Sequence, residues 1–281
     1  MLCFRVVNLL IPGNPGMVDL PLPSGTWTLT KGQNFASDVE AIGKGQCVET
    51  YILEHPVSMD AGSAAVDEAF DEITPILLAA SYATGLSVTI KRSTPGSECM
   101  IMQPSEHWPR DRAMGPPSPV VALEAEFIAL IQSFVQNWPQ AGQTEKARLL
   151  VHHWLDALSC WSMEDLYLST TTLLQIIVAT EATRQGNAGL RYYPGVTAAA
   201  NHKRIRVLGN DFKNMRNELI HDGRLIGSRF AGPDKAACAA VVADVLNWFD
   251  DYLHTALGLG SVKKTRFRPT DFQSLNAYSI S

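Results

Sequence analysis

Apolar residues recur every three or four positions through most of the second half of the chain. Phe127, Leu130 and Phe134 fall on one stripe of a helix, because their spacing follows its 3.6-residue period. That helix covers about residues 121–138. Apolar spacing, together with helix start and stop signals, predicts further helices over 144–159, 163–185, 197–208, 210–221 and 233–257. The sequence therefore predicts an all-α helical bundle for residues 121–257.

Polar residues mark the ends of two of these helices. Ser162 and Asp165 have the spacing of a capping box, which predicts that a helix begins directly after Ser162. Asn210 suits the N-cap of a later, short helix, and Gly223 suits its C-terminal end. This short helix carries the residues with the most distinctive chemistry in the chain.

The first part of the chain follows a different pattern. It is rich in Gly, Pro, Ser and Thr, and its apolar residues gather in short runs that favour strands. These runs cover residues 3–10, 26–30, 46–53, 86–91 and 98–102. Helical spacing occurs only between Gly62 and Gly85. The pattern predicts a small α+β domain over residues 1–103.

Two other segments complete the predicted organisation. Residues 104–120 form a proline-rich linker, because consecutive prolines such as Pro116 and Pro117 interrupt regular structure. Residues 258–281 are predicted to be a basic tail. Its basic residues are Lys263, Lys264, Arg266 and Arg268, and Phe267 among them could stack on a base.

Charge and composition narrow the classes of function. The chain has 281 residues and a net charge of -5, which argues against a surface coated with basic charge for nucleic acid. The acidity belongs to residues 1–120, with seven basic and thirteen acidic residues, whereas 121–281 carry sixteen and fifteen. The cysteines form no CxxC pair, and no apolar stretch is long enough to span a bilayer. We expect a cytoplasmic protein with free thiols, no bound metal and no membrane partner.

The short helix before Gly223 brings together residues suited to phosphate chemistry. Asn217 and His221 are four residues apart and share a face, and Arg216 can reach toward the same space. Arginine can bind a phosphate through two hydrogen bonds, and histidine exchanges protons near neutral pH. The pattern is typical of metal-independent phosphodiester chemistry. In a purely structural reading, Arg216 would pair with Glu218 and His221 would cap the helix.

These residues resemble a known family. Arg216-Asn217-x3-His221, late in a helical bundle, resembles the R-x4-6-H motif of HEPN domains, and Asn217 supplies the polar residue that follows the arginine in that motif. The longer stretch MRNELIHDG is similar to the ApeA-like branch of the family. The resemblance covers about residues 121–257. It implies an α+β domain followed by a HEPN-like helical bundle.

The resemblance also implies an activity. The protein would be an endoribonuclease without metal or cofactor, and a toxin or an effector of antiviral defence. A ribose 2′-hydroxyl would attack the adjacent phosphate, with His221 handling the proton, Arg216 stabilising the transition state and Asn217 orienting the phosphate or the histidine. Relatives often carry an acidic residue where this chain has Gln175, and Glu181 is the candidate to replace it. A homodimer through the bundle and a regulatory partner at the N-terminal domain are also implied.

Local charge adds candidate RNA contacts. Residues 201–229 contain seven basic and three acidic side chains, and five of the basic ones are predicted to bind RNA. These are Lys203, Arg204, Arg206, Lys213 and Arg224. The alternative function is a non-catalytic helical adaptor that binds a protein or an RNA. A third is a small-ligand sensor that acts through the N-terminal domain.

Overall fold

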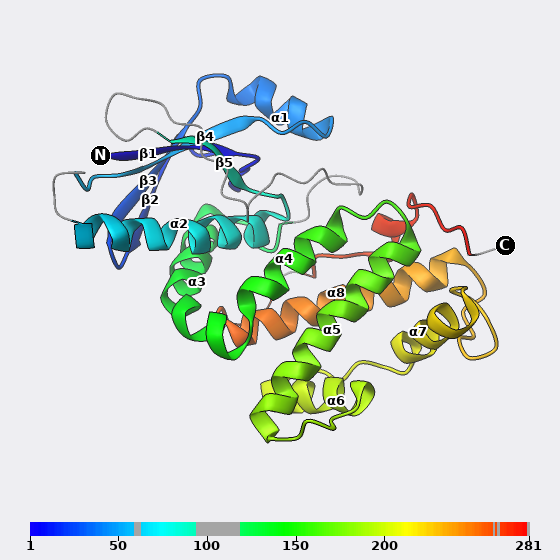
Figure 1. The fold of residues 1–281 in the computed structure, drawn as a ribbon. Coiled ribbons are helices and arrows are strands. Elements are labelled where there is room, and N and C mark those ends of the chain that lie inside the picture. Colours follow the sequence, from blue (N-terminus) through cyan, green and yellow to red (C-terminus); the bar gives the residue numbers. More distant parts are fainter. Residues whose placement is uncertain (59–62, 94–118, 261, 263–264, 280–281) are drawn as a thin grey trace. The chain divides into compact units, whose positions relative to one another are not determined.

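The computed structural model describes residues 1–58, 63–93, 119–260, 262 and 265–279. The chain forms two compact units, one that ends at Pro139 and one that starts at Gln140 (Figure 1). The division therefore falls inside a helix and not in the predicted linker over 104–120. Most of that linker, and the strand predicted over 98–102, lie outside the described residues.

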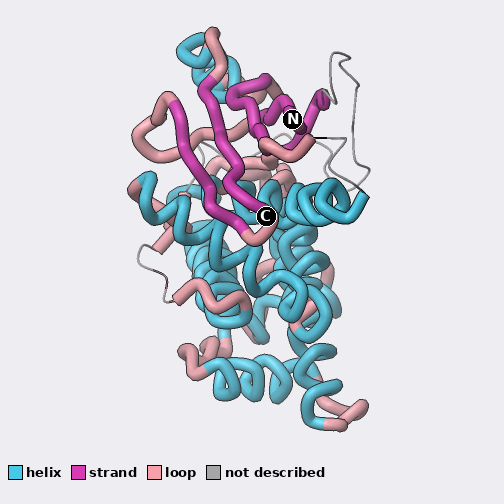
Figure 2. Tube along the Cα trace, turned by 90° about the vertical axis from the view of Figure 1, so that its left-hand side faces the viewer, coloured by secondary structure: helices cyan, strands magenta, loops and turns pink. Residues whose placement is uncertain are grey.

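The first unit contains an antiparallel sheet. Within the described residues it has five strands in the order β2-β3-β4-β1-β5. The strands are β1 (Leu2–Val7), β2 (Met17–Leu22), β3 (Gly25–Lys31), β4 (Glu49–His55) and β5 (Thr89–Ser93). Side chains alternate along β2, where Val18 and Leu20 are buried and Asp19 is exposed. Figure 2 shows the strands in magenta and the helices in cyan.

Two helices accompany this sheet. The helix predicted between Gly62 and Gly85 is confirmed as α2 (Ser63–Thr84), which lies along one face of the sheet (Figure 1). Phe70 of α2 meets Phe4 of β1 edge to face, with ring centroids 6.0 Å apart. The short helix α1 (Phe35–Gly43) was not predicted, because Phe35 is its only buried residue.

The start of α3 (Glu124–Thr144) belongs to the first unit. Two hydrogen bonds join this part of the chain to the rest of the first unit. The amide of Val120 donates to the carbonyl of Ala83 at 2.9 Å, and Gln132 Nε2 donates to the carbonyl of Pro21 at 3.1 Å. The predicted domain boundary after residue 120 therefore differs from the observed one.

The second unit is helical, as predicted. Its helices after α3 are α4 (Ala147–Leu158), α5 (Met163–Gln185), α6 (Tyr192–Lys203), α7 (Asp211–Asp222), α8 (Lys235–Ala256) and the 3-10 helix η1 (Pro269–Phe272). Large side chains such as Trp154, Tyr167 and Trp248 are fully buried in its core. The predicted order of an α+β region followed by a helical region is confirmed.

Capping accounts for the helix ends. Ser162 is the N-cap of α5, and its Oγ accepts from the Asp165 amide at 3.1 Å, as the spacing predicted. α6 starts earlier than the predicted residue 197 and ends earlier than 208. It ends at Lys203 because Arg204 adopts a left-handed backbone conformation with φ of 56°.

The C-terminal segment differs from the predicted free tail. Arg266 has a side chain with 0% exposure and pairs with Asp250 at 3.2 Å. Phe267 is 2% exposed, so it is a core residue and not a stacking surface for a base. Asn247 of α8 exchanges two hydrogen bonds with the backbone of Phe267, at 2.9 and 3.0 Å. Residues 265–279 are therefore part of the folded second unit.

Candidate functional site

The predicted motif lies on α7 of the second unit. This helix buries Phe212, Met215 and Glu218, and ends at Gly223, which has φ of 67°. Asn210 is its N-cap, as predicted, although its side chain makes no capping hydrogen bond. Arg216 is four residues after Phe212 and lies at one edge of this buried stripe, whereas Asn217 is on the opposite side of the helix and His221 is exposed in its last turn.

Arg216 is held by an aromatic ring. Its guanidinium carbon lies 4.7 Å from the ring centroid of Tyr192, the first residue of α6. The Nε of Arg216 is buried and has no hydrogen-bond partner among the described residues. Burial raises the pKa of Tyr192, and the positive charge of Arg216 opposes that rise. No carboxylate in the described part of the chain pairs with Arg216. The ion pair with Glu218, expected if Arg216 had only a structural role, is therefore not formed.

Asn217 is held by the next residue of α6. The Tyr193 hydroxyl donates to Asn217 Oδ1 at 2.7 Å and also approaches the Lys213 carbonyl at 3.3 Å. Lys213 Nζ lies 4.9 Å from the Tyr193 ring centroid. Two consecutive tyrosines therefore hold two consecutive motif residues, and sequence reasoning missed both. The available signal was the aromatic pair directly before Pro194.

His221 lies in the last turn of α7 and is exposed. Its imidazole makes no hydrogen bond or ion pair with any residue that the structure describes, and so does not cap the helix. Arg216 and His221 are five residues apart, which separates their Cα atoms by about 7.5 Å along the helix axis and about 140° around it. The imidazole is therefore available to a ligand, on a different side of α7 from Arg216.

The five predicted RNA-binding residues have different surroundings. Lys203 is 9% exposed and pairs with Glu145 at 2.9 Å. Arg206 pairs with Asp244 at 2.7 Å. The remaining three are Arg224, whose Nε lies 3.6 Å from Glu218, Lys213, which lies over Tyr193, and Arg204, which is exposed. Lys213 is thus next to the motif, whereas Lys203 forms an ion pair with the buried carboxylate of Glu145.

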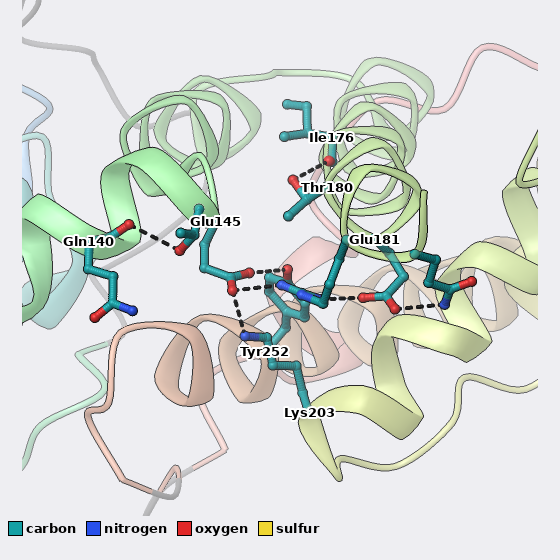
Figure 3. Close-up of polar contacts among 10 residues, drawn as sticks. Gln140, Glu145, Ile176, Thr180, Glu181, Lys203 and Tyr252 are labelled. Carbon is teal, nitrogen blue, oxygen red and sulfur yellow. Dashed lines mark hydrogen bonds and ion pairs between the residues drawn. The ribbon is translucent and has the colours of Figure 1, made fainter. Parts of the chain in front are cut away.

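That carboxylate belongs to a separate polar cluster (Figure 3). Glu145 accepts from Arg184 at 2.7 Å, from Lys203 at 2.9 Å and from the Tyr252 hydroxyl at 2.9 Å. Burial works to raise the pKa of Glu145, but Lys203, Tyr252 and Arg184 together hold it below its usual value. The cluster stabilises the core of the second unit.

Glu181 belongs to the same cluster and not to the motif. It pairs with Arg184 and accepts from Gln185 Nε2 at 2.7 Å. The Tyr192 hydroxyl meets α5 at the carbonyl of Thr171, ten residues earlier, which is about 15 Å along the helix. Glu181 is therefore engaged elsewhere. Gln175 lines a groove of about 710 Å³ on α5 that Tyr192 also lines.

The first unit has a polar cluster that could be taken for a serine nucleophile with its base. Ser24 Oγ lies 3.4 Å from His55 Nε2 and donates to Glu72, which also accepts from Trp27 Nε1 at 2.8 Å. His55 Nδ1 accepts from the Val57 amide at 3.2 Å, so the neutral ring carries its proton on Nε2. That nitrogen cannot take a proton from Ser24. The cluster instead ties the β2–β3 turn to α2 and β4.

Metal sites, membrane-spanning helices and similarity to known proteins each bear on the class of function. Among the described residues, no three His, Cys, Asp or Glu side chains gather closely enough to share a metal ion. No helix in the described ranges combines the length and apolar composition needed to cross a bilayer. Comparison with protein-family models, curated proteins and solved structures gave no match for this chain. The function is therefore inferred from the residues of the site.

Proposed function

We propose that the second unit is a HEPN-like endoribonuclease that cleaves RNA without a metal ion. The observation that carries the proposal is the state of Arg216, whose guanidinium has no carboxylate partner among the described residues and is oriented by Tyr192. An arginine held in this way can accept a phosphate without first giving up an ion pair. Asn217, also held in place, and the free imidazole of His221 supply the other groups that the chemistry needs.

The proposed reaction is a transesterification. His221 accepts the proton of a ribose 2′-hydroxyl, the 2′ oxygen forms a bond to the adjacent phosphorus, and the bond from phosphorus to the 5′ oxygen breaks. The 5′ oxygen leaves with a proton from a second, protonated histidine. Arg216 stabilises the charge that develops on the phosphate oxygens. The products are a 2′,3′-cyclic phosphate and a free 5′-hydroxyl, and DNA is inert because it lacks the 2′-hydroxyl.

The need for a second histidine implies a homodimer, because the motif of one chain supplies only His221. Within one chain, Arg216 and His221 lie on different sides of α7, about 140° apart around its axis. A second copy related by a twofold axis brings His221 of one chain to Arg216 of the other. One composite cleft then contains two arginines and two histidines. A role as a toxin or an antiviral effector, restrained through the first unit, would follow from such an activity.

The test is cleavage of RNA by purified protein, with analysis of the new ends. We expect cyclic phosphate ends from the wild type and a loss of at least about 100-fold in rate for Arg216→Ala and His221→Ala. His202→Ala is the matched control, because His202 is also exposed, in the last turn of α6. Full activity of both motif variants would refute the proposal.

A second candidate is an adaptor that binds a protein partner without catalysis. It is favoured by Ile220, an apolar side chain that is 49% exposed directly beside His221. The two candidates differ in their response to substitution. An adaptor would lose its partner in Ile220→Asp and keep it in His221→Ala, and wild-type protein would leave RNA intact.

A further inference from the structure

Glu218, inside the predicted motif, is a fully buried carboxylate with 0% exposure. Its Oε1 accepts from the backbone amide of Arg229, and its Oε2 has no hydrogen-bond partner, with Arg224 Nε at 3.6 Å. The carboxylate therefore reaches from α7 into the following loop, residues 223–230. A carboxylate is costly to bury, and one with an unpartnered oxygen is a poor choice for stability alone.

The loop is shaped around this carboxylate. A Cβ atom added to Gly227 would overlap the side chain of Glu218, so only glycine fits at this position without a shift. Gly227 has no positive φ, which means that its backbone would accept alanine. The requirement for glycine therefore comes from the close approach of Glu218 and not from the backbone conformation.

Two further contacts hold the same loop. Arg229 pairs through Nη1 with Asp222, the last residue of α7. The amide of Leu225 donates to Ser279 Oγ at 3.2 Å, and Ser279 itself donates to the buried Glu164 of α5, at 2.6 Å from Oγ and 2.9 Å from its amide. The loop is thus fixed at both ends by buried carboxylates, directly by Glu218 and through Ser279 by Glu164.

His221 lies between these contacts. It is three residues after Glu218 on α7 and two residues before the loop starts at Gly223. The last turn of a helix is where fraying is easiest, because its carbonyls lack partners in the helix. Contacts on either side of His221 along the chain therefore restrain the backbone from which the imidazole projects.

We propose that Glu218 is a positioning residue, which fixes His221 by anchoring the 223–230 loop to α7. The inference rests on the proposed role of His221 in RNA cleavage. Glu218 does not touch the substrate. It should therefore act on the turnover step, through the orientation of the imidazole, and leave substrate affinity unchanged.

The kinetic test uses Glu218→Ala and Gly227→Ala, with Ser228→Ala as the matched control in the same loop. We expect both test variants to lower kcat for RNA cleavage at least tenfold, with KM within twofold of the wild type. Glu218→Gln keeps the oxygen that accepts from the Arg229 amide and should retain most of kcat. Ser228 is exposed, and its variant should match the wild type. Wild-type kcat in Glu218→Ala and Gly227→Ala would overturn the proposal.

Amide hydrogen exchange provides a readout that does not depend on activity. In the wild-type protein the Arg229 amide should exchange at least tenfold more slowly than the Ser228 amide, and this needs no variant that might fail to fold. Gly227→Ala should accelerate exchange at Arg229, His221 and Asp222. Equal exchange at Arg229 and Ser228 in the wild type would overturn the proposal.

The two proposals can fail separately. If the wild type leaves RNA intact while the Arg229 amide is protected, the ribonuclease proposal fails and the anchoring of the loop stands. If the wild type cleaves RNA and Gly227→Ala does so at the same kcat, the positioning role fails and the ribonuclease proposal stands.

Discussion

The hydroxyl of Tyr193 donates a 2.7 Å hydrogen bond to Oδ1 of Asn217, which joins the start of α6 to the middle of α7. The bond fixes which side of the Asn217 amide faces Tyr193, so the amide nitrogen is left as a donor for a ligand. The neighbouring Tyr192 orients Arg216 in the same region. The start of α6 is therefore a support for the motif on α7.

In the proposed ribonuclease, removal of that hydroxyl should weaken catalysis more than folding. Tyr193→Phe keeps the ring that packs on Phe212, with centroids 5.8 Å apart, and loses the bond to Asn217. We expect RNA cleavage to slow about tenfold and the free energy of unfolding to fall by about 1 kcal/mol. Cleavage kinetics and urea unfolding measure the two effects. Tyr192→Phe is the control, because its hydroxyl makes only a 3.4 Å contact to the Thr171 carbonyl. Cleavage at the wild-type rate in Tyr193→Phe would contradict this prediction.

Mixing wild-type protein with an inactive variant tests the composite cleft. The proposed reaction uses both histidines of a dimer, so a dimer with one His221→Ala chain should be inactive. In an equal mixture of wild type and His221→Ala, about a quarter of the dimers are fully wild type, so about a quarter of the activity of an all-wild-type sample should remain. Cleavage rates at constant total protein, after the subunits have exchanged, measure this. Retention of about half of the activity would show that the groups act within one chain.

Stability of the second unit should decrease in mild acid because of His254. Burial, aided by the positive charge of Arg266, lowers the pKa of His254 to about 4. The folded state favours the neutral imidazole of His254. The contribution of this residue to the free energy of unfolding is therefore full above pH 6.5, and it is lost as the pH falls toward 4. Between pH 7 and 5 we expect a loss of about 2 kcal/mol from this residue.

Urea unfolding at several pH values measures the effect of His254. The His254→Gln variant is the control, because glutamine does not titrate in this range. Its unfolding free energy should change less between pH 7 and 5 than that of the wild type. Equal slopes for the two proteins would contradict the assignment.

The Asp250–Arg266 pair should make the C-terminal segment essential for stability. Asp250→Ala leaves the buried guanidinium of Arg266 without this carboxylate, and such a change costs about 3–5 kcal/mol. Replacing both partners, in Asp250→Ala with Arg266→Met, should recover part of the loss because no buried charge remains. Urea unfolding of the three proteins measures this. A double variant less stable than Asp250→Ala would contradict the prediction.

The fold could be predicted where local pattern and packing agree. α2 was expected from its apolar spacing and α5 from the capping box of Ser162 and Asp165, and both signals lie in contiguous sequence. β2 was not, because Pro21 argues against a strand, and it is tolerated here because β2 lies at the edge of the sheet. The burial of Arg266 was equally hidden, since it depends on Asp250, which lies on a different element.

The same limit applies to prediction of the site. The spacing of Arg216, Asn217 and His221 was readable because all three lie on one helix. The roles of Tyr193 and Glu218 were not readable, because each depends on a segment that only the tertiary structure brings to α7. Sequence therefore indicates the groups that could react, and the structure adds the groups that hold them.

The position of the division inside α3 has a practical consequence. A fragment cut at residue 121, the boundary suggested by the sequence, would keep Phe127, Ile131 and Phe134 but lose the rest of the first unit. All three side chains are 0% exposed in the whole protein. Once exposed on one stripe of a helix, they would make that fragment prone to aggregation. A fragment that begins at Gln140 avoids this stripe and is the better starting point for studying the helical unit alone.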